Sequence, residues 1–209
     1  MQPSILENSI NVPCSPFEDA AHESRMLKQY VKLLVRCDNP EILDMGPVCG
    51  NNISFFLDYA AKLHVYDVLA HTNDNSRQPS LTFLIKNLTY KKNSLDGIHL
   101  WDMHDHLDNK TFGSMLSELS LLLKPHGLLV MISSNVVSGQ QPFFQYLKTD
   151  KDLTVMLQKD RSRRLPYFYR TNRDIEKVMK PFERIGSYIC TNGVREFLFR
   201  RPKETKTPS

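Results

Sequence analysis

The sequence predicts a single-domain α/β protein: a doubly wound, mostly parallel sheet that closes with a C-terminal antiparallel hairpin. An apolar run at 41–45 is followed at once by a glycine turn, a helical pattern at 52–62 and a second apolar run at 63–66. Further apolar runs alternate with helical patterns, which is typical of βα repeats. Near the end, Asn-Gly at 192–193 separates two apolar runs, and this is a strong hairpin signal.

The opening unit has the spacing of a nucleotide-binding strand–turn–helix–strand. Gly46 and Gly50 allow the backbone to turn sharply and to approach a ligand, and the following helix begins with unpaired N–H groups. Asp67 ends the second strand about 20 residues beyond the turn, where a carboxylate can accept both hydroxyls of a ribose. A tight turn that binds no ligand is the alternative interpretation of the glycines alone.

Composition fits an ordinary globular domain, with 209 residues, 41% hydrophobic and 24% charged. The apolar runs are too short to span a bilayer and no signal peptide is evident, which predicts a cytoplasmic protein with no membrane partner. A net charge of +4 permits a nucleic-acid partner without arguing for one. The four cysteines have no paired spacing, so no metal site and no disulfide framework are predicted.

Outside the repeats, residues 1–14 are expected to form an irregular arm and 203–209 a polar tail. The Ser-Pro-x-Glu pattern at 15–18 has the form of a helix cap and predicts a helix that ends near 37–40. That helix either simply covers the sheet or also closes over a ligand.

Another helix is predicted at 109–123, stopped by Lys-Pro-His-Gly, and a last one at 175–182. The polar stretch at 70–80 leaves room for a short helix at most. The predicted strands lie at 41–45, 63–66, 81–85, 98–101, 128–132, 184–190 and 194–199, which makes a seven-stranded sheet.

Residues 135–170 depart from the βα pattern and are interpreted as an insertion. Apolar residues at 142–144 and 153–157 predict one or two helices there. A basic run at 159–164 precedes an aromatic one, a combination that can track a nucleic-acid backbone and stack on bases. A solvated charge run beside packed aromatics is the simpler interpretation.

The opening unit resembles motif I of the class I S-adenosylmethionine-dependent methyltransferases, D-x-G-x-G-x-G. Asp44, Gly46 and Gly50 match its acid, first glycine and last glycine, whereas Val48 stands where the family has its middle glycine. A second segment agrees in order and spacing, because Leu-Lys-Pro-His-Gly at 123–127 and the apolar strand after it are similar to the family's "LRPGG" passage.

The resemblance implies the seven-stranded methyltransferase fold and S-adenosylmethionine as cofactor. It also implies that the insertion at 135–170 is a substrate lid. Asn87 stands where the family commonly has an acid that contacts adenine, and a turn asparagine without a ligand is the alternative. The implied cofactor-binding residues are Asp44, Gly46, Pro47 and Gly50 at the methionine end, Asp67 at the ribose, Val68, Asn87 and Leu88 at the adenine, and Trp101 and Asp102 beside the methyl donor.

The acceptor side is less defined. His104 is the candidate base, since its loop is expected near the transferred methyl group. His-Asp-His at 104–106 could also ligate a metal, but a solvated loop is the favoured interpretation. Tyr167, Tyr169 and Arg170 are candidate substrate contacts in the insertion. A small-molecule acceptor is favoured over RNA or protein. A degenerate, non-catalytic member that binds only a ligand or a partner is the competing prediction.

Overall fold

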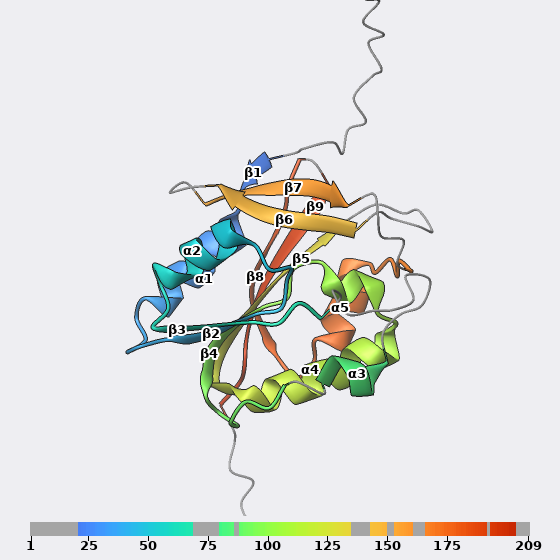
Figure 1. The fold of residues 1–209 in the computed structure, drawn as a ribbon. Coiled ribbons are helices and arrows are strands. Elements are labelled where there is room, and N and C mark those ends of the chain that lie inside the picture. Colours follow the sequence, from blue (N-terminus) through green and yellow to red (C-terminus); the bar gives the residue numbers. More distant parts are fainter. Residues whose placement is uncertain are drawn as a thin grey trace, which may run out of the picture.

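The structure is a computed structural model that describes residues 21–68, 80–85, 88–134, 143–149, 153–160, 166–191 and 193–203. Within them, a six-stranded sheet has the order β3-β2-β4-β5-β9-β8 (Figure 1). The first four of these strands are parallel, and β9 and β8 run antiparallel as a hairpin, which confirms the predicted arrangement. The strands are β2 (Glu41–Asp44), β3 (Lys62–Val65), β4 (Leu95–His99), β5 (Leu123–Ser134), β8 (Glu183–Ile189) and β9 (Val194–Arg200).

Helices cover both faces of this sheet, as a doubly wound fold requires (Figure 1). α1 (Arg25–Leu34) and α2 (Gly50–Leu57) lie on one face. α3 (Leu81–Ile85), α4 (Asn109–Leu122) and α5 (Asn172–Val178) lie on the other. Side chains of Ser24, Asp108 and Thr171 accept hydrogen bonds from the first turns of α1, α4 and α5, so local sequence fixes where these three helices begin.

Alternating residues of the strands divide the core into two clusters, because successive side chains of a strand point to opposite faces. Leu43, Ile98 and Leu129 pack under α4. Their neighbours Ile42 and Leu128 pack under α1 and α2. The parallel strands are therefore buried on both sides, which holds their carboxyl ends in a fixed arrangement.

The predicted third strand at 81–85 is wrong, because these residues form the helix α3. The Leu84 N–H donates to the Ser80 carbonyl over 3.0 Å, and Leu81, Leu84 and Ile85 pack on the cluster beneath α4. A five-residue apolar run fits a buried strand or a buried helical turn equally well. The described sheet therefore has six strands, and the predicted seventh is not among them.

The helices predicted within the insertion are also wrong. Residues there form β6 (Phe143–Thr149) and β7 (Thr154–Asp160), which pair antiparallel. β7 pairs in turn with β1 (Ala21–Glu23), giving a second sheet of order β1-β7-β6, here called the cover sheet. The cover sheet lies across the end of the large sheet at which β5 finishes (Figure 1).

The helix predicted from the pattern at 15–18 to about 37–40 is not continuous, because β1 interrupts it. Residues 21–23 are strand, and Ser24 caps α1 by accepting a hydrogen bond from the Leu27 N–H over 3.1 Å. The Ser24 N–H donates to the Leu153 carbonyl over 3.0 Å, so the start of α1 is joined to the cover sheet.

Several predictions fall outside the described residues: the arm at 1–14, the cap at 15–18, the stretch at 69–79 and most of the tail. Residues 135–142 and 161–165 of the insertion do too, so its role as a lid stays a prediction. Among the residues that the structure describes, no helix combines the length and the apolar character needed to cross a bilayer.

Candidate functional site

Three parallel strands bring the predicted site residues together at their carboxyl ends. Asp44 at the end of β2 lies beside Val65 of β3 on one side and His99 of β4 on the other. The segments that leave these strands carry the glycine loop (residues 46–50) and Asp67. Residues far apart in the sequence therefore meet at one edge of the sheet, where open α/β folds bind ligands.

Asp44 connects Gly46 to Trp101. The indole Nε1 donates a hydrogen bond to Asp44 Oδ1 over 2.6 Å, and the Gly46 N–H donates to the same oxygen over 3.1 Å. A Cβ on residue 46 would lie only 2.2 Å from Trp101 Cδ1. Any larger residue would have to displace the buried indole, so Trp101 by itself requires glycine at this position.

The second carboxyl oxygen of Asp44, Oδ2, is buried and has no hydrogen-bond partner among the described residues. Burial is the main cause that raises the pKa of Asp44 to about 7. The hydrogen bonds from Trp101 and Gly46 oppose this rise, and the charge of Asp67 adds to it. A buried carboxyl oxygen without a partner is unfavourable, and a second carboxylate nearby makes it more so. The two acids together therefore favour a positively charged ligand.

Beyond Gly46, the glycine loop is open. The side chain of Val48 is 66% exposed, and a Cβ on Gly50 would meet no atom within 4 Å. α2 begins at Gly50, and its N-cap residue Cys49 makes no side-chain hydrogen bond to the helix. This helix end therefore offers N–H donors to an anionic group, next to the two acids.

The predicted ribose and adenine residues follow β3. Asp67 is half-buried two residues after the strand ends. Val68 is buried in the cluster beneath α4, and the half-buried Leu88 packs against the same cluster. Asn87 lies outside the described residues, so its proposed contact with adenine stays a prediction.

A buried arginine fixes the turn that follows β4. That turn is the 3₁₀ helix η1 (Met103–His106), preceded by the buried Asp102. Arg170 Nη1 donates to the His104 carbonyl over 2.8 Å and its Nη2 donates to the Leu107 carbonyl. Its Nε donates to Asn109 Oδ1 over 2.7 Å. The guanidinium therefore ties η1 to the start of α4.

A second buried arginine extends this arrangement to β5 and β9. Arg195 Nη1 donates to the Arg170 carbonyl over 2.7 Å, and its Nη2 donates to Ser133 Oγ over 3.0 Å. The Ser133 hydroxyl donates in turn to Asp105 Oδ1 over 3.0 Å. We call these residues (Asp105, Ser133, Arg170 and Arg195) the arginine network. It holds residues 166–171 against η1, where the Phe168 N–H also donates to the Asp105 carbonyl over 2.7 Å.

The candidate base, His104, has no exposed surface and lies against the Phe112 ring, with Nε2 3.2 Å from Asp105 Oδ1. Burial lowers the pKa of His104 well below its usual range, and the charges of Arg170 and Arg195 lower it further. An enclosed, weakly basic imidazole is poorly placed to take a proton from a substrate. Its position therefore does not support the predicted role.

The three candidate substrate contacts differ in accessibility. Tyr169 is exposed, Tyr167 is half-buried and Arg170 is buried. The hydrogen bonds of the Arg170 side chain go to main-chain carbonyls and Asn109, so the structure gives this residue a positioning part. Only the two tyrosines remain as side chains that a substrate could contact, and that role stays a prediction.

Sequence reasoning missed His99, which lies inside the site. Its ring packs on Trp101 and Phe56, with centroids 3.9 and 5.4 Å away. Both ring nitrogens are buried without a hydrogen-bond partner among the described residues, and burial lowers the pKa of His99 to about 3. A histidine inside an apolar strand was the available signal. Arg195 was also missed, and nothing in its local pattern distinguishes it.

Comparison with known proteins identifies no relative by sequence, since neither a protein-family model nor a curated protein matches the chain. Solved structures do match. The N-methyltransferase NodS from Bradyrhizobium japonicum WM9, in complex with S-adenosylhomocysteine, has a TM-score of 0.51 at 13% identity, covering 86% of this chain and 89% of its own.

Two further methyltransferases are similar to a comparable extent. The 1,6-didemethyltoxoflavin-N1-methyltransferase of Burkholderia thailandensis, with bound 1,6-didemethyltoxoflavin and S-adenosylhomocysteine, has a TM-score of 0.50 at 13% identity, covering 86% of this chain and 79% of its own. An S-adenosylmethionine-dependent methyltransferase from Mesorhizobium loti has a TM-score of 0.51 at 9% identity, covering 83% and 96%. The chain thus has the fold of the class I S-adenosylmethionine-dependent methyltransferases.

Proposed function

We propose that this protein is a methyltransferase that binds S-adenosylmethionine at the carboxyl ends of β2, β3 and β4. One observation carries the proposal: a buried carboxyl oxygen of Asp44 has no hydrogen-bond partner among the described residues. It lies near a second acid, Asp67, and beside the start of α2, whose N-cap side chain makes no hydrogen bond to the helix. S-adenosylmethionine carries a sulfonium, an ammonium and a carboxylate. The acids suit its positive groups and the N-terminus of α2 suits its carboxylate, so the residues present fit this cofactor.

Within the proposal, each predicted residue keeps a defined part. Asp44 orders the glycine loop through Gly46, and Gly50 leaves room for close backbone approach to the methionine end. Asp67 accepts the ribose hydroxyls. The adenine lies near Val68, Asn87 and Leu88, and Trp101 and Asp102 lie beside the methyl donor.

When bound, S-adenosylmethionine supplies a methyl group that is already activated by its positively charged sulfur. The chain then has to orient an acceptor and exclude water, and correct positioning alone supplies much of a rate enhancement. The arginine network suits this task, because it fixes the turn after β4 on which Asp102 stands. No side-chain base is required, which agrees with the enclosed position of His104.

A small molecule is the proposed acceptor. The net charge is modest, Asp160 interrupts the basic run of the insertion, and Asp150 and Asp152 precede that run. The Burkholderia enzyme has a small heterocycle bound together with the cofactor product, and its fold is similar. An RNA acceptor would instead require several phosphate contacts.

A non-catalytic binding protein is the second candidate, and a specific observation favours it. Gly46 and Asp44, two of the three motif I matches, are both explained by the packing of Trp101, without any ligand. Val48 also departs from the family's middle glycine. A chain that keeps the fold but no longer binds the cofactor would show the same contacts.

Calorimetric titration with S-adenosylmethionine separates the two candidates. We expect binding by the wild-type protein and a loss of about 1.5–3 kcal/mol in Asp67→Ala, the range for hydrogen bonds to a charged group. Asp58→Ala is the matched control, because Asp58 is exposed at the far end of α2, and it should bind like the wild type. Equal affinities for wild type and Asp67→Ala would contradict the site, and no binding by either would favour the non-catalytic candidate.

The acceptor class is tested with methyl-labelled cofactor and cell extract separated into small molecules, RNA and protein. We expect label only in the small-molecule fraction. Label in RNA would overturn the small-molecule proposal if two conditions held. The label would have to decrease with rising salt, and it would have to disappear when Arg161, Arg163 and Arg164 were neutralised together.

A further inference from the structure

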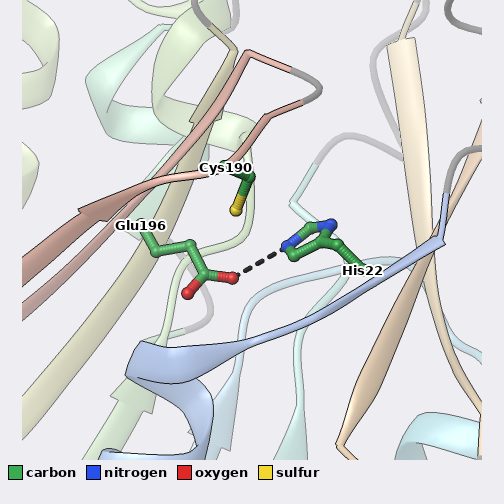
Figure 2. Close-up of side chains that lie close together, drawn as sticks. All are labelled: His22, Cys190 and Glu196. Carbon is green, nitrogen blue, oxygen red and sulfur yellow. Dashed lines mark hydrogen bonds and ion pairs between the residues drawn. The ribbon is translucent and has the colours of Figure 1, made fainter.

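Three side chains that can ligate metals converge where the cover sheet meets the large sheet. His22 comes from β1, Cys190 follows β8, and Glu196 comes from the middle of β9 (Figure 2). One ligand atom from each lies within 4.8 Å of the other two. In Figure 2 the Cys190 sulfur and the His22 ring both point towards the Glu196 carboxylate.

The Glu196 carboxylate is held in place from both sides. Its Oε2 accepts a hydrogen bond from the Met26 N–H in the first turn of α1 over 3.0 Å. Its Oε1 is 2.9 Å from His22 Nε2. One oxygen is therefore oriented by the helix while the other faces the histidine and the cysteine. This is the arrangement of a ligand whose orientation is set by an outer hydrogen bond.

The carboxylate and the thiol of this group lie away from solvent. Glu196 has no exposed surface and Cys190 is buried. The Arg25 guanidinium stacks over the Tyr188 ring, 4.2 Å from its centroid. A divalent cation bound by one thiolate and one carboxylate would leave a buried centre with no net charge.

We propose that His22 Nε2, Cys190 Sγ and Glu196 Oε1 bind one zinc ion. Nitrogen, sulfur and oxygen donors of these types are the usual zinc ligands, and three protein ligands with water in the fourth position make a complete tetrahedral site. Ligand atoms around such an ion stand about 3.3–3.8 Å apart. The metal therefore replaces the His22–Glu196 hydrogen bond and draws the sulfur inwards.

Zinc binding at this site releases one proton. The Cys190 S–H bond breaks, the sulfur lone pair binds the metal, and the proton passes to the buffer. His22 binds as the neutral ring with its proton on Nδ1, and Glu196 binds as the carboxylate.

The site has a structural consequence. His22 pairs with Val155 in the cover sheet, whereas Glu196 pairs with Ile132 and Tyr188 in the large sheet. A zinc ion there joins the two sheets directly, at a position distinct from Asp44 and Asp67. Its effect is therefore expected on the stability of the cover sheet, independently of cofactor binding.

Metal titration of the full chain tests the proposal. After chelator treatment, we expect one zinc ion per chain to bind, with release of one proton measured by calorimetry in buffers of different ionisation enthalpy. Cobalt(II) in place of zinc should give a thiolate-to-metal charge-transfer absorption. Cys190→Ser should abolish that absorption and weaken zinc binding by more than about 100-fold, beyond the loss expected for an outer-shell partner.

Cys37→Ser is the matched control, because Cys37 is an exposed cysteine on the same chain, and it should leave binding unchanged. His22→Gln provides a second variant that keeps the thiol, and it should weaken zinc binding while retaining a wild-type far-UV spectrum. Failure of the wild-type protein to bind zinc would overturn the proposal. So would a cobalt spectrum that survives in Cys190→Ser.

Discussion

The two sides of the candidate site differ in how their charged side chains are held. After β4, five guanidinium nitrogens of the arginine network donate to carbonyls, a hydroxyl and an amide, and these bonds tie η1, β5 and α4 together. After β2, Asp44 Oδ2 is buried without a partner in the described part of the chain, next to an exposed glycine loop. Paired networks make a structure rigid, whereas a buried carboxyl oxygen beside an open loop can be completed by a ligand. We therefore assign a structural role to the first region and a ligand-binding role to the second.

The largest expected effect is on the scaffold side. Arg170→Met leaves two main-chain carbonyls and the Asn109 amide without their donor, and each unsatisfied buried group costs about 1–3 kcal/mol. We expect the free energy of unfolding, measured in urea, to fall by about 4–5 kcal/mol. Arg184→Met is the control, since that exposed ion pair with Glu176 contributes about 0–1 kcal/mol. If Arg170→Met lowered the free energy of unfolding no more than Arg184→Met does, the distinction between the two regions would be contradicted.

On the binding side, Asp44 should make stability depend on pH. Its pKa of about 7 in the folded protein lies above the value of 3.8 for an ordinary aspartate, so between these values only the folded state keeps the proton. The contribution of Asp44 to the free energy of unfolding is then full below about pH 4. It falls by roughly 4 kcal/mol as pH rises to about 7.

Asp44→Asn keeps an oxygen that can accept from Trp101 and Gly46 but cannot ionise. Its stability relative to the wild type should therefore increase from pH 4 to pH 7, in urea titrations at several pH values. Asp58→Asn, at an exposed position, should show no such trend. If the free energies of unfolding of the wild type and of Asp44→Asn changed with pH in parallel, Asp44 would not be a buried acid with a raised pKa.

A smaller effect tests why residue 46 is glycine. Gly46→Ala places a Cβ against the indole and should destabilise the protein by about 1–3 kcal/mol, the usual cost of overpacking. In a Trp101→Ala background, this cost should largely disappear. Cofactor affinity in the double variant is then compared with that in Trp101→Ala alone. Equal affinities would make Trp101 the sole reason for the glycine, and a lower affinity in the double variant would show that the ligand also needs it.

The smallest effect concerns Val48. Its side chain is mostly exposed, so Val48→Gly should lower stability only through the added freedom of the unfolded chain, by about 0.5–1 kcal/mol. Cofactor affinity should stay the same or increase, because the family has glycine here. Weaker binding in calorimetry would show that the loop is shaped around valine.

The sequence predicted the elements that local pattern determines. The opening strand, the glycine turn, α4 and the closing hairpin were confirmed, since periodicity, caps and Asn-Gly are local signals. The elements that depend on distant partners were not predictable in this way. Residues 81–85 form a helix because α4 lies beside them, and β6 and β7 exist because they pair with each other and with β1.

The candidate site follows the same division. Asp44 and Asp67 could be placed because spacing along one βαβ unit fixes both. Other features could not be predicted, because they depend on packing between distant segments. These are the burial of Arg170, its bonds to carbonyls 63 and 66 residues away, and the enclosure of His104. The convergence of His22, Cys190 and Glu196 has no sequence spacing that would reveal it.

The central claim is that the Asp44–Trp101 region binds the cofactor, and the chain offers a direct probe because Trp101 is its single tryptophan. Its fluorescence should change saturably on titration with S-adenosylhomocysteine, with the affinity that calorimetry gives for the same ligand. The change should be weakened in Asp67→Ala and preserved in Asp58→Ala. Calorimetric binding with no response of Trp101, or an equal response in Asp67→Ala, would contradict the account.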